Sequence, residues 1–217
     1  MLVDEGKNSH FVHASVQEFF AARYIKNRTD IVASKFYGQV LNGKWGAWGE
    51  ELSFLKQIDP YRSFKYFYIP DLQRSLDYLM SGKPAVDSDV VANYLSSLGV
   101  IKRNKVVDGR TNISYVVDKQ IHFNTYHMNA LSLRVFTSMF AGYPHDARIK
   151  PWTAGFDSNP ECVTRSYKEI ADDRGNFFKD DLYSKVSIFI NEFYRDSLVM
   201  QDFVRRQEDQ TDFIDIS

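Results

Sequence analysis

Apolar side chains recur at helical spacing near the start of the chain. The first predicted helix carries them at i, i+3, i+4 and i+8: Val16, Phe19, Phe20 and Tyr24. Ser15 and Glu18 form a Ser-x-x-Glu capping box, so we expect the helix to begin at Ser15 and to end near Lys26. A short strand over residues 9–13 is predicted immediately before it.

Two stronger helical patterns lie in the middle of the chain. Residues 51–68 predict one broken helix or two short ones around Pro60, and Pro70 is expected to begin a new helix. That helix carries an apolar stripe: Leu72, Leu76, Leu79 and Met80. Asp87 or Ser88 is expected to cap the next one, and Gly99 to stand at its C-cap. Its apolar face is Val90, Val91, Tyr94, Leu95 and Leu98.

A switch to alternating positions follows the second of these helices. Residues 100–107 and 113–118 predict a β-hairpin with Asp108-Gly109 in its turn. The order helix, helix, hairpin predicts a winged helix-turn-helix unit.

The remaining third predicts helices separated by an irregular loop. Helices are expected over residues 129–141, 161–173 and 179–206, with a loop over 142–160 and an acidic end. The predicted fold is therefore mainly α with a small β-hairpin, a helical domain containing a winged-helix-like unit. The predicted parts are 1–50, a winged-helix end with a linker; 51–128, the winged-helix-like unit; and 129–217, a C-terminal helical region with an acidic tail.

Composition narrows the class of protein. The chain has 217 residues, 44% hydrophobic and 15% aromatic, which favours a packed core over disorder. Residues 151–217 carry 8 Lys or Arg against 14 Asp or Glu, leaving 19 against 14 in residues 1–150. Neither charge balance is extreme enough to require a nucleic acid or a membrane as the partner. The single cysteine, the lack of a signal-peptide pattern and the lack of a long apolar run predict a soluble cytoplasmic protein.

Enzyme and metal motifs are missing from the sequence. No phosphate-binding Gly-rich loop occurs, so we do not expect this chain alone to bind or hydrolyse a nucleotide. The histidine pairs and Cys162 lack the spacing of a metal site. The carboxylate pairs Asp172-Asp173 and Asp180-Asp181 fit helix ends and solvated charge. We expect no catalytic residues and no metal ligands, with an enzyme of another type as an open alternative.

The predicted hairpin carries a basic set: Lys102, Arg103, Lys105 and Arg110. A basic wing beside a helix-turn-helix can contact DNA phosphates, so a winged-helix nucleic-acid-binding or transcription regulatory protein is the alternative function. Against it, residues 87–98 contain Asp87 and Asp89, and Asn93 is their only base-reading residue type. A protein contact is the favoured interpretation of these four residues and of three tryptophans: Trp45, Trp48 and Trp152.

The stretch "FVHASVQEFFAARYI" resembles the C-terminal signature of NACHT-type NTPases of the STAND class. The family pattern, Phe-x-His-x-Ser-Phe-Gln-Glu-Phe/Tyr-x-Ala-Ala, lies in the winged-helix part of that module. The matching positions are Phe11, His13, Ser15, Gln17, Glu18, Phe19, Ala21 and Ala22, and Val16 stands where the family often has Phe. The resemblance covers about one tenth of the chain.

The resemblance implies a role for His13. In the family this histidine points at the β-phosphate of bound ADP, so His13 is the cofactor-binding candidate, acting only with an NTPase domain that this chain lacks. A half-buried His that stabilises the strand–helix junction is the open alternative. ATP or ADP and Mg would belong to the parent protein, with none in this chain.

The resemblance also implies a function and partners. We expect a non-enzymatic C-terminal sensor or regulatory region of a NACHT-type STAND ATPase, in bacterial antiphage defence. Its expected partners are an upstream NACHT NTPase domain and a protein trigger, with no membrane. A cut polypeptide, a truncated gene product and a separately encoded partner are open alternatives.

Overall fold

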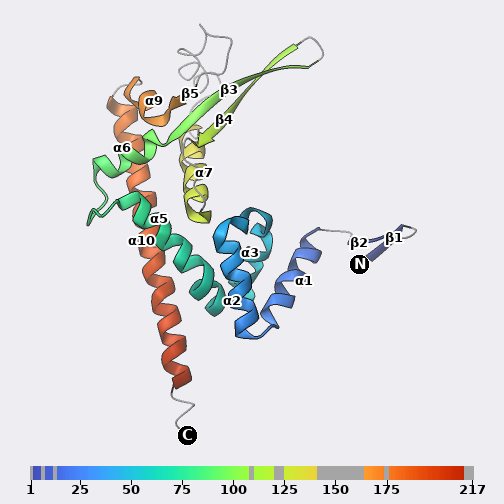
Figure 1. The fold of residues 1–217 in the computed structure, drawn as a ribbon. Coiled ribbons are helices and arrows are strands. Elements are labelled where there is room, and N and C mark those ends of the chain that lie inside the picture. Colours follow the sequence, from blue (N-terminus) through green and yellow to red (C-terminus); the bar gives the residue numbers. More distant parts are fainter. Residues whose placement is uncertain are drawn as a thin grey trace. The chain divides into compact units, whose positions relative to one another are not determined.

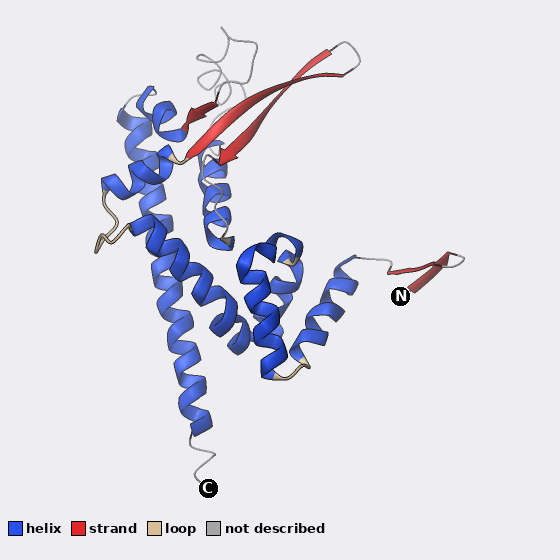
Figure 2. Cartoon of the chain, viewed as in Figure 1, coloured by secondary structure: helices blue, strands red, loops and turns tan. Residues whose placement is uncertain are grey.

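A computed structural model describes residues 2–5, 8–11, 14–107, 110–119, 125–140, 164–173 and 176–212 (Figure 1). Helices make up most of these residues, which confirms the predicted mainly α-helical fold (Figure 2). The chain divides into two compact units. Unit 1 holds Met1–Ser75, Asn124–Tyr126 and Tyr194–Ser217, and unit 2 holds Leu76–Phe123 and His127–Phe193.

Unit 1 consists of a strand pair and a series of short helical segments. Its elements are β1 (Leu2–Glu5), β2 (Asn8–Phe11), α1 (Ala14–Lys26), α2 (Asp30–Gln39), the π turn η1 (Val40–Lys44), the 3-10 turn η2 (Trp45–Ala47), α3 (Gly49–Ile58), α4 (Pro60–Ser63), the π turn η3 (Phe64–Tyr68), and parts of α5 (Ile69–Met80), α7 (Tyr126–Phe140) and α10 (Asn176–Asp212). The helix predicted to end near Lys26 is confirmed as α1. Because α1 begins at Ala14, Ser15 is the second residue of the helix, and the predicted N-cap is wrong by two residues.

Pro70 does not begin a helix. The backbone is helical from Pro60 to Met80, and Ile69 before the proline has φ −64° and ψ −51°. A proline inside a helix removes one hydrogen bond and collides with the carbonyl four residues earlier. The π turn η3 ends at Tyr68, two residues before Pro70, so the carbonyl four residues before the proline lies in a turn with i→i+5 rather than i→i+4 hydrogen bonds. The expected helix start at Pro70 is therefore wrong, whereas the break at Pro60 is confirmed.

The core of unit 1 is built from alanine, leucine and aromatic side chains. α1 packs on α3, where Ala22 is fully buried and the Phe19 and Phe54 rings meet edge to face at 5.6 Å. The other fully buried apolar residues of this unit are Ala33, Tyr37, Leu52, Leu55, Phe67 and Leu72. A second aromatic group joins η2, η3 and the start of α7. The Tyr126 ring centroid lies 5.9 Å from that of Phe67 and 5.8 Å from that of Tyr68.

Unit 2 holds the end of α5, most of α7 and α10, and these further elements: α6 (Ser88–Ser96), β3 (Leu98–Val107), β4 (Arg110–Lys119), β5 (Thr164–Ser166) and α9 (Tyr167–Asp173). The Asp87 carboxylate accepts the backbone N–H of Val90 at 2.8 Å, which confirms Asp87 as the cap of α6. Ser97, in helical conformation, ends the helix and Gly99 belongs to β3, so the expected C-cap at Gly99 is wrong.

The sheet of unit 2 has the strand order β4-β3-β5. β3 pairs antiparallel with β4, with Lys102 opposite Tyr115 and Lys105 opposite Asn112, and antiparallel with β5 on its other edge. α6 and α9 pack together beside β3. The fully buried side chains of this unit include Leu95, Leu98, Leu131, Val135, Tyr167, Val186 and Ile190. Burial raises the pKa of the Tyr94 and Tyr167 phenols, so both side chains stay neutral.

Candidate functional site

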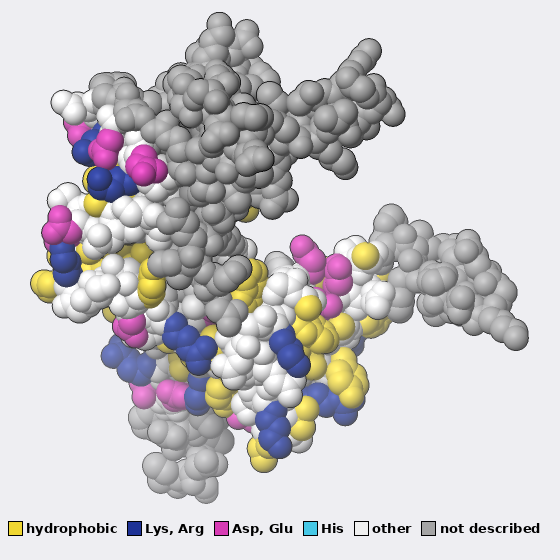
Figure 3. Space-filling view, turned by 45° about the horizontal axis from the view of Figure 1, so that its top comes forward, with side chains coloured by type: hydrophobic (Ala, Val, Ile, Leu, Met, Phe, Trp, Pro, Cys, Tyr) yellow, Lys and Arg dark blue, Asp and Glu magenta, His cyan; other side chains and the backbone are white. Residues whose placement is uncertain are grey.

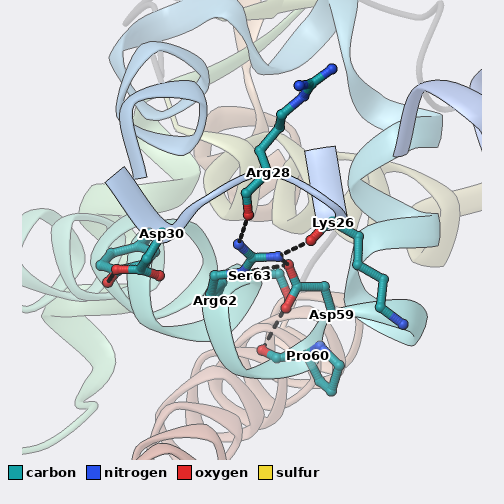
Figure 4. Close-up of polar contacts among 8 residues, drawn as sticks. Lys26, Arg28, Asp30, Asp59, Pro60, Arg62 and Ser63 are labelled. Carbon is teal, nitrogen blue, oxygen red and sulfur yellow. Dashed lines mark hydrogen bonds and ion pairs between the residues drawn. The ribbon is translucent and has the colours of Figure 1, made fainter. Parts of the chain in front are cut away.

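Arg62 on α4 holds the turn between α1 and α2 (Figure 4). Its Nε donates to Oδ2 of Asp59 at 2.8 Å, and one terminal nitrogen donates to the carbonyl oxygen of Arg28 at 2.8 Å. The other terminal nitrogen donates to the carbonyl oxygen of Lys26. The last carbonyls of a helix lack partners within the helix, and the helix dipole favours a cation there. Arg62 therefore closes the C-terminal end of α1 and links it to α4.

The local sequence explains how Arg62 and Asp59 meet. Asp59 ends α3 with φ −145°, and Pro60 supplies the first residue of α4 with the backbone angle that a helix start requires. Residues three apart on a helix lie on the same face, so Arg62 returns to the Asp59 carboxylate. The two side chains are 13% and 11% exposed. The pair is therefore largely withdrawn from water.

A second polar contact fixes the other side of the same turn. The Tyr66 hydroxyl of η3 donates to Oδ2 of Asp30, the first residue of α2, at 2.6 Å. This bond to the carboxylate, with some burial, raises the pKa of Tyr66, because the phenol must keep its proton to donate it. The α4–η3 segment therefore binds both the end of α1 and the start of α2.

The end of α10 is attached to the same segment. Lys65 Nζ lies 2.7 Å from Oε1 of Glu208 and also donates to the Tyr61 hydroxyl at 2.9 Å. The hydrogen bond from Lys65 holds the pKa of Glu208 below its ordinary value, and the same bond raises the pKa of Lys65. Five residues before Glu208 on α10, the ring of Phe203 meets that of Phe64 at 5.4 Å. The last turns of α10 thus lie against η3 within unit 1.

The pKa shift of Glu208 predicts a pH-dependent contribution to stability. A carboxyl group whose pKa is lowered by folding stabilises the fold above its unfolded pKa, near 4.5, and loses this effect as the pH falls through the folded value. We expect wild type to melt above Glu208→Gln at neutral pH, and the difference to shrink steadily as the pH falls below about 4.5. Thermal melts across this range measure it. Asp209→Asn, at an exposed neighbouring position, is the control, and a Glu208→Gln difference that stays constant with pH would contradict the assignment.

The outer side of α1 and α2 exposes large apolar side chains. We define the α1–α2 face by four of them and their exposed fractions: Phe20 52%, Tyr24 57%, Ile31 69% and Val32 46%. The face also carries exposed basic residues: Arg23, Lys26, Arg28 and Lys35. The Arg28 guanidinium stacks 3.7 Å from the centre of the Tyr24 ring. Figure 3 shows hydrophobic side chains next to Lys and Arg side chains over these helices.

This combination is typical of a binding surface. Single exposed apolar residues are common on proteins, but several on two neighbouring helices indicate a contact with another segment or protein. Of the described α1 residues only Ala22 is buried. The basic side chains favour an acidic counterpart.

The predicted contact residues fall into three groups. Trp48 meets the Phe36 ring at 5.1 Å and Trp45 meets the Tyr126 ring at 6.1 Å, so both indoles contact their own unit. The basic residues predicted for the wing lie on β3 and β4, at positions whose side chains are outside the described part: Lys102, Arg103, Lys105 and Arg110. His13 and Trp152 also lie outside the described residues. A partner role for each of these residues stays a prediction.

The sequence analysis did not predict α2. It also did not predict the Arg62 clamp, the name we give to the hydrogen bonds from Arg62 to Asp59 and to the carbonyls of Lys26 and Arg28. A signal for α2 was present, because Ala33, Tyr37 and Val40 are buried at i, i+4 and i+7 spacing. For the clamp, Asp59-Pro60 marked a helix start with Arg62 three residues later.

Comparison with known proteins gives no relative, since no family model, curated protein or solved structure matches the chain. None of the described helices is long and apolar enough to cross a membrane. Within the described ranges, no group of three His, Cys, Asp or Glu side chains is placed to hold a metal ion.

Proposed function

We propose that this chain is a non-enzymatic C-terminal sensor or regulatory region of a NACHT-type STAND ATPase, acting in the cytoplasm in bacterial antiphage defence. The observation that carries the proposal is the family-like stretch around α1. Of its apolar positions, Phe19 packs on Phe54 of α3 and Ala22 is fully buried, whereas Phe20 and Tyr24 are about half exposed. A helix of this kind has one face for its own unit and one for a partner, here the upstream NTPase domain.

The order of elements in unit 2 supports a winged-helix-like unit as part of the proposal. α5 and α6 are followed by the antiparallel strands β3 and β4, with β5 on the free edge of β3. The nucleic-acid alternative has less support at α6. Lys83 before that helix is engaged by Asp87 at 2.7 Å and Asp89 at 2.9 Å, and α6 itself has no Lys or Arg. An acidic helix start repels DNA phosphates rather than binding them.

The proposed mechanism is a shift between two arrangements of the whole receptor. A ligand moves such an equilibrium only by its difference in affinity for the two states. In this proposal His13 donates a hydrogen bond to ADP held by the NTPase domain, and a protein trigger binding the C-terminal region favours the other arrangement. Nucleotide and Mg would be held by that upstream domain.

The test combines genome context with nucleotide release. We expect a P-loop coding frame upstream of this sequence, whose full-length product binds ADP. In that product His13→Ala should accelerate release of fluorescent ADP by about 10-fold or more, because a hydrogen bond to a charged group contributes roughly 1.5–3 kcal/mol.

His10→Ala is the matched control, since His10 lies three residues earlier on β2 and outside the family pattern. We expect it to leave ADP release unchanged. The absence of any P-loop partner, or equal ADP release from His13→Ala and wild type, would refute the proposal.

A further inference from the structure

The end of the chain has the composition that the α1–α2 face would select. From Glu208 onward the sequence carries no Lys or Arg and four acidic residues: Glu208, Asp209, Asp212 and Asp215. The last five residues, 213–217, also contain Phe213, Ile214 and Ile216. Residues 208–217 therefore combine acidic and apolar side chains, and residues 213–217 lie outside the described part of the chain.

The α1–α2 face offers the opposite charge with the same apolar character. Residues 14–39 carry four basic residues against two acidic ones, Glu18 and Asp30. Asp30 is already engaged by the Tyr66 hydroxyl, which leaves the basic residues dominant around the exposed apolar side chains. Charge and hydrophobicity on this face both complement residues 213–217.

The position of α10 brings this segment within reach of the face. Glu208 is fixed to Lys65, and Arg62, three residues before Lys65, contacts the end of α1. Three helical residues correspond to about 5 Å along the axis. The segment starts one helical turn after Glu208, and its five residues span about 17 Å when extended. All of these elements belong to unit 1.

We propose that residues 213–217 bind the α1–α2 face of their own chain. Phe213 and Ile214 cover apolar side chains of the face, and Asp215 pairs with its Arg or Lys side chains. Bound in this way, the segment shields the face and competes with any partner for it. The proposal does not require an upstream NTPase domain, so it can hold even if the proposed function fails.

The linkage of the segment to α10 makes even weak contacts effective. A short tether gives an effective concentration in the millimolar range. With a dissociation constant of about 100 μM for the free peptide, the tethered segment would cover the face about nine-tenths of the time.

The experiment measures binding of a fluorescent peptide with the sequence of residues 207–217. Its targets are the full chain and a chain that ends at Asp212. We expect the shortened chain to bind the peptide about 10-fold more tightly than the full chain, because residues 213–217 no longer compete for the face, and we expect the affinity to fall at high salt. Equal affinity for the two chains, or no binding to the shortened chain at about 1 mM peptide, would overturn the proposal.

Charge exchange identifies the binding surface. In the shortened chain, Arg23→Glu with Lys35→Glu should abolish peptide binding, and a peptide with Asp212→Lys and Asp215→Lys should restore it. Ile188→Ser, at an exposed apolar position of unit 2, is the control and should leave affinity unchanged. Circular dichroism verifies the fold of each variant. The assignment to this face is wrong if the peptide with the two lysines fails to bind the folded chain that carries Arg23→Glu and Lys35→Glu.

Discussion

Replacing Arg62 by methionine is expected to lower the free energy of unfolding of unit 1 by about 3 kcal/mol. Methionine keeps the unbranched aliphatic stem of the side chain but lacks the guanidinium group, so it removes all three hydrogen bonds, to Asp59 and to the carbonyls of Lys26 and Arg28. The Asp59 carboxylate, 11% exposed, would lose its cation. Removing one partner of a largely buried ion pair is strongly destabilising, because the remaining charge is left without compensation.

Urea unfolding followed by tryptophan fluorescence measures this effect, since Trp45 and Trp48 both lie in unit 1. Arg62→Lys should recover only part of the loss, because an ammonium group cannot span the three acceptors as a planar guanidinium does. Adding Asp59→Asn to Arg62→Met should also recover part of the lost stability, since the uncompensated charge of the Asp59 carboxylate disappears. The control is Arg195→Ala at an exposed position of α10. If Arg62→Met unfolds at the same urea concentration as this control, the clamp does not stabilise the fold.

The sequence predicted the elements whose signals are local. The helix near Lys26, the break at Pro60 and the Asp87 cap each depend on neighbouring residues, and each is confirmed. Pro70 was misread because its effect depends on the turn before it. The π turn η3 accommodates the proline, and nothing in the apolar spacing of residues 64–68 distinguishes a π turn from an α-helical one.

The candidate site was less accessible to sequence analysis for a different physical reason. Two of the three acceptors of Arg62 are backbone carbonyls, more than 30 residues away along the chain. A backbone acceptor leaves no trace in residue identity, so pairing of this kind cannot be predicted from composition or spacing. The α1–α2 face was equally hidden, because Phe20 and Tyr24 follow the same spacing as core residues and only the fold shows that they are exposed.

Asp71→Ala is expected to lower the free energy of unfolding by about 2 kcal/mol. Asp71 is fully buried on α5, and its Oδ1 accepts the backbone N–H of Tyr126, the first residue of α7, at 3.0 Å. Ser75 Oγ donates to the hydroxyl of Thr125 next to it at 3.0 Å. Asp71 therefore acts as a helix cap supplied by a residue 55 positions earlier in the chain.

The consequences of Asp71→Ala should concentrate at the start of α7. The partly buried N–H of Tyr126 would lose this acceptor, so the first turn of α7 should show faster hydrogen exchange. Tyr126 should shift with that turn and alter the emission of Trp45, whose ring it contacts. Asp71→Asn retains an acceptor oxygen and should lose about half as much stability as Asp71→Ala.

Hydrogen exchange also distinguishes the effect of losing the Asp59–Arg62 pair from the effect of losing the Asp71 carboxylate. Arg62→Met should raise exchange at the α1–α2 turn and leave α7 protected, because Arg62 contacts only the former, whereas Asp71→Ala should do the reverse. Asp196→Ala, at an exposed site of α10, should leave both regions unchanged. An Asp71→Ala variant whose stability lies within about 0.5 kcal/mol of wild type would mean that another group caps α7.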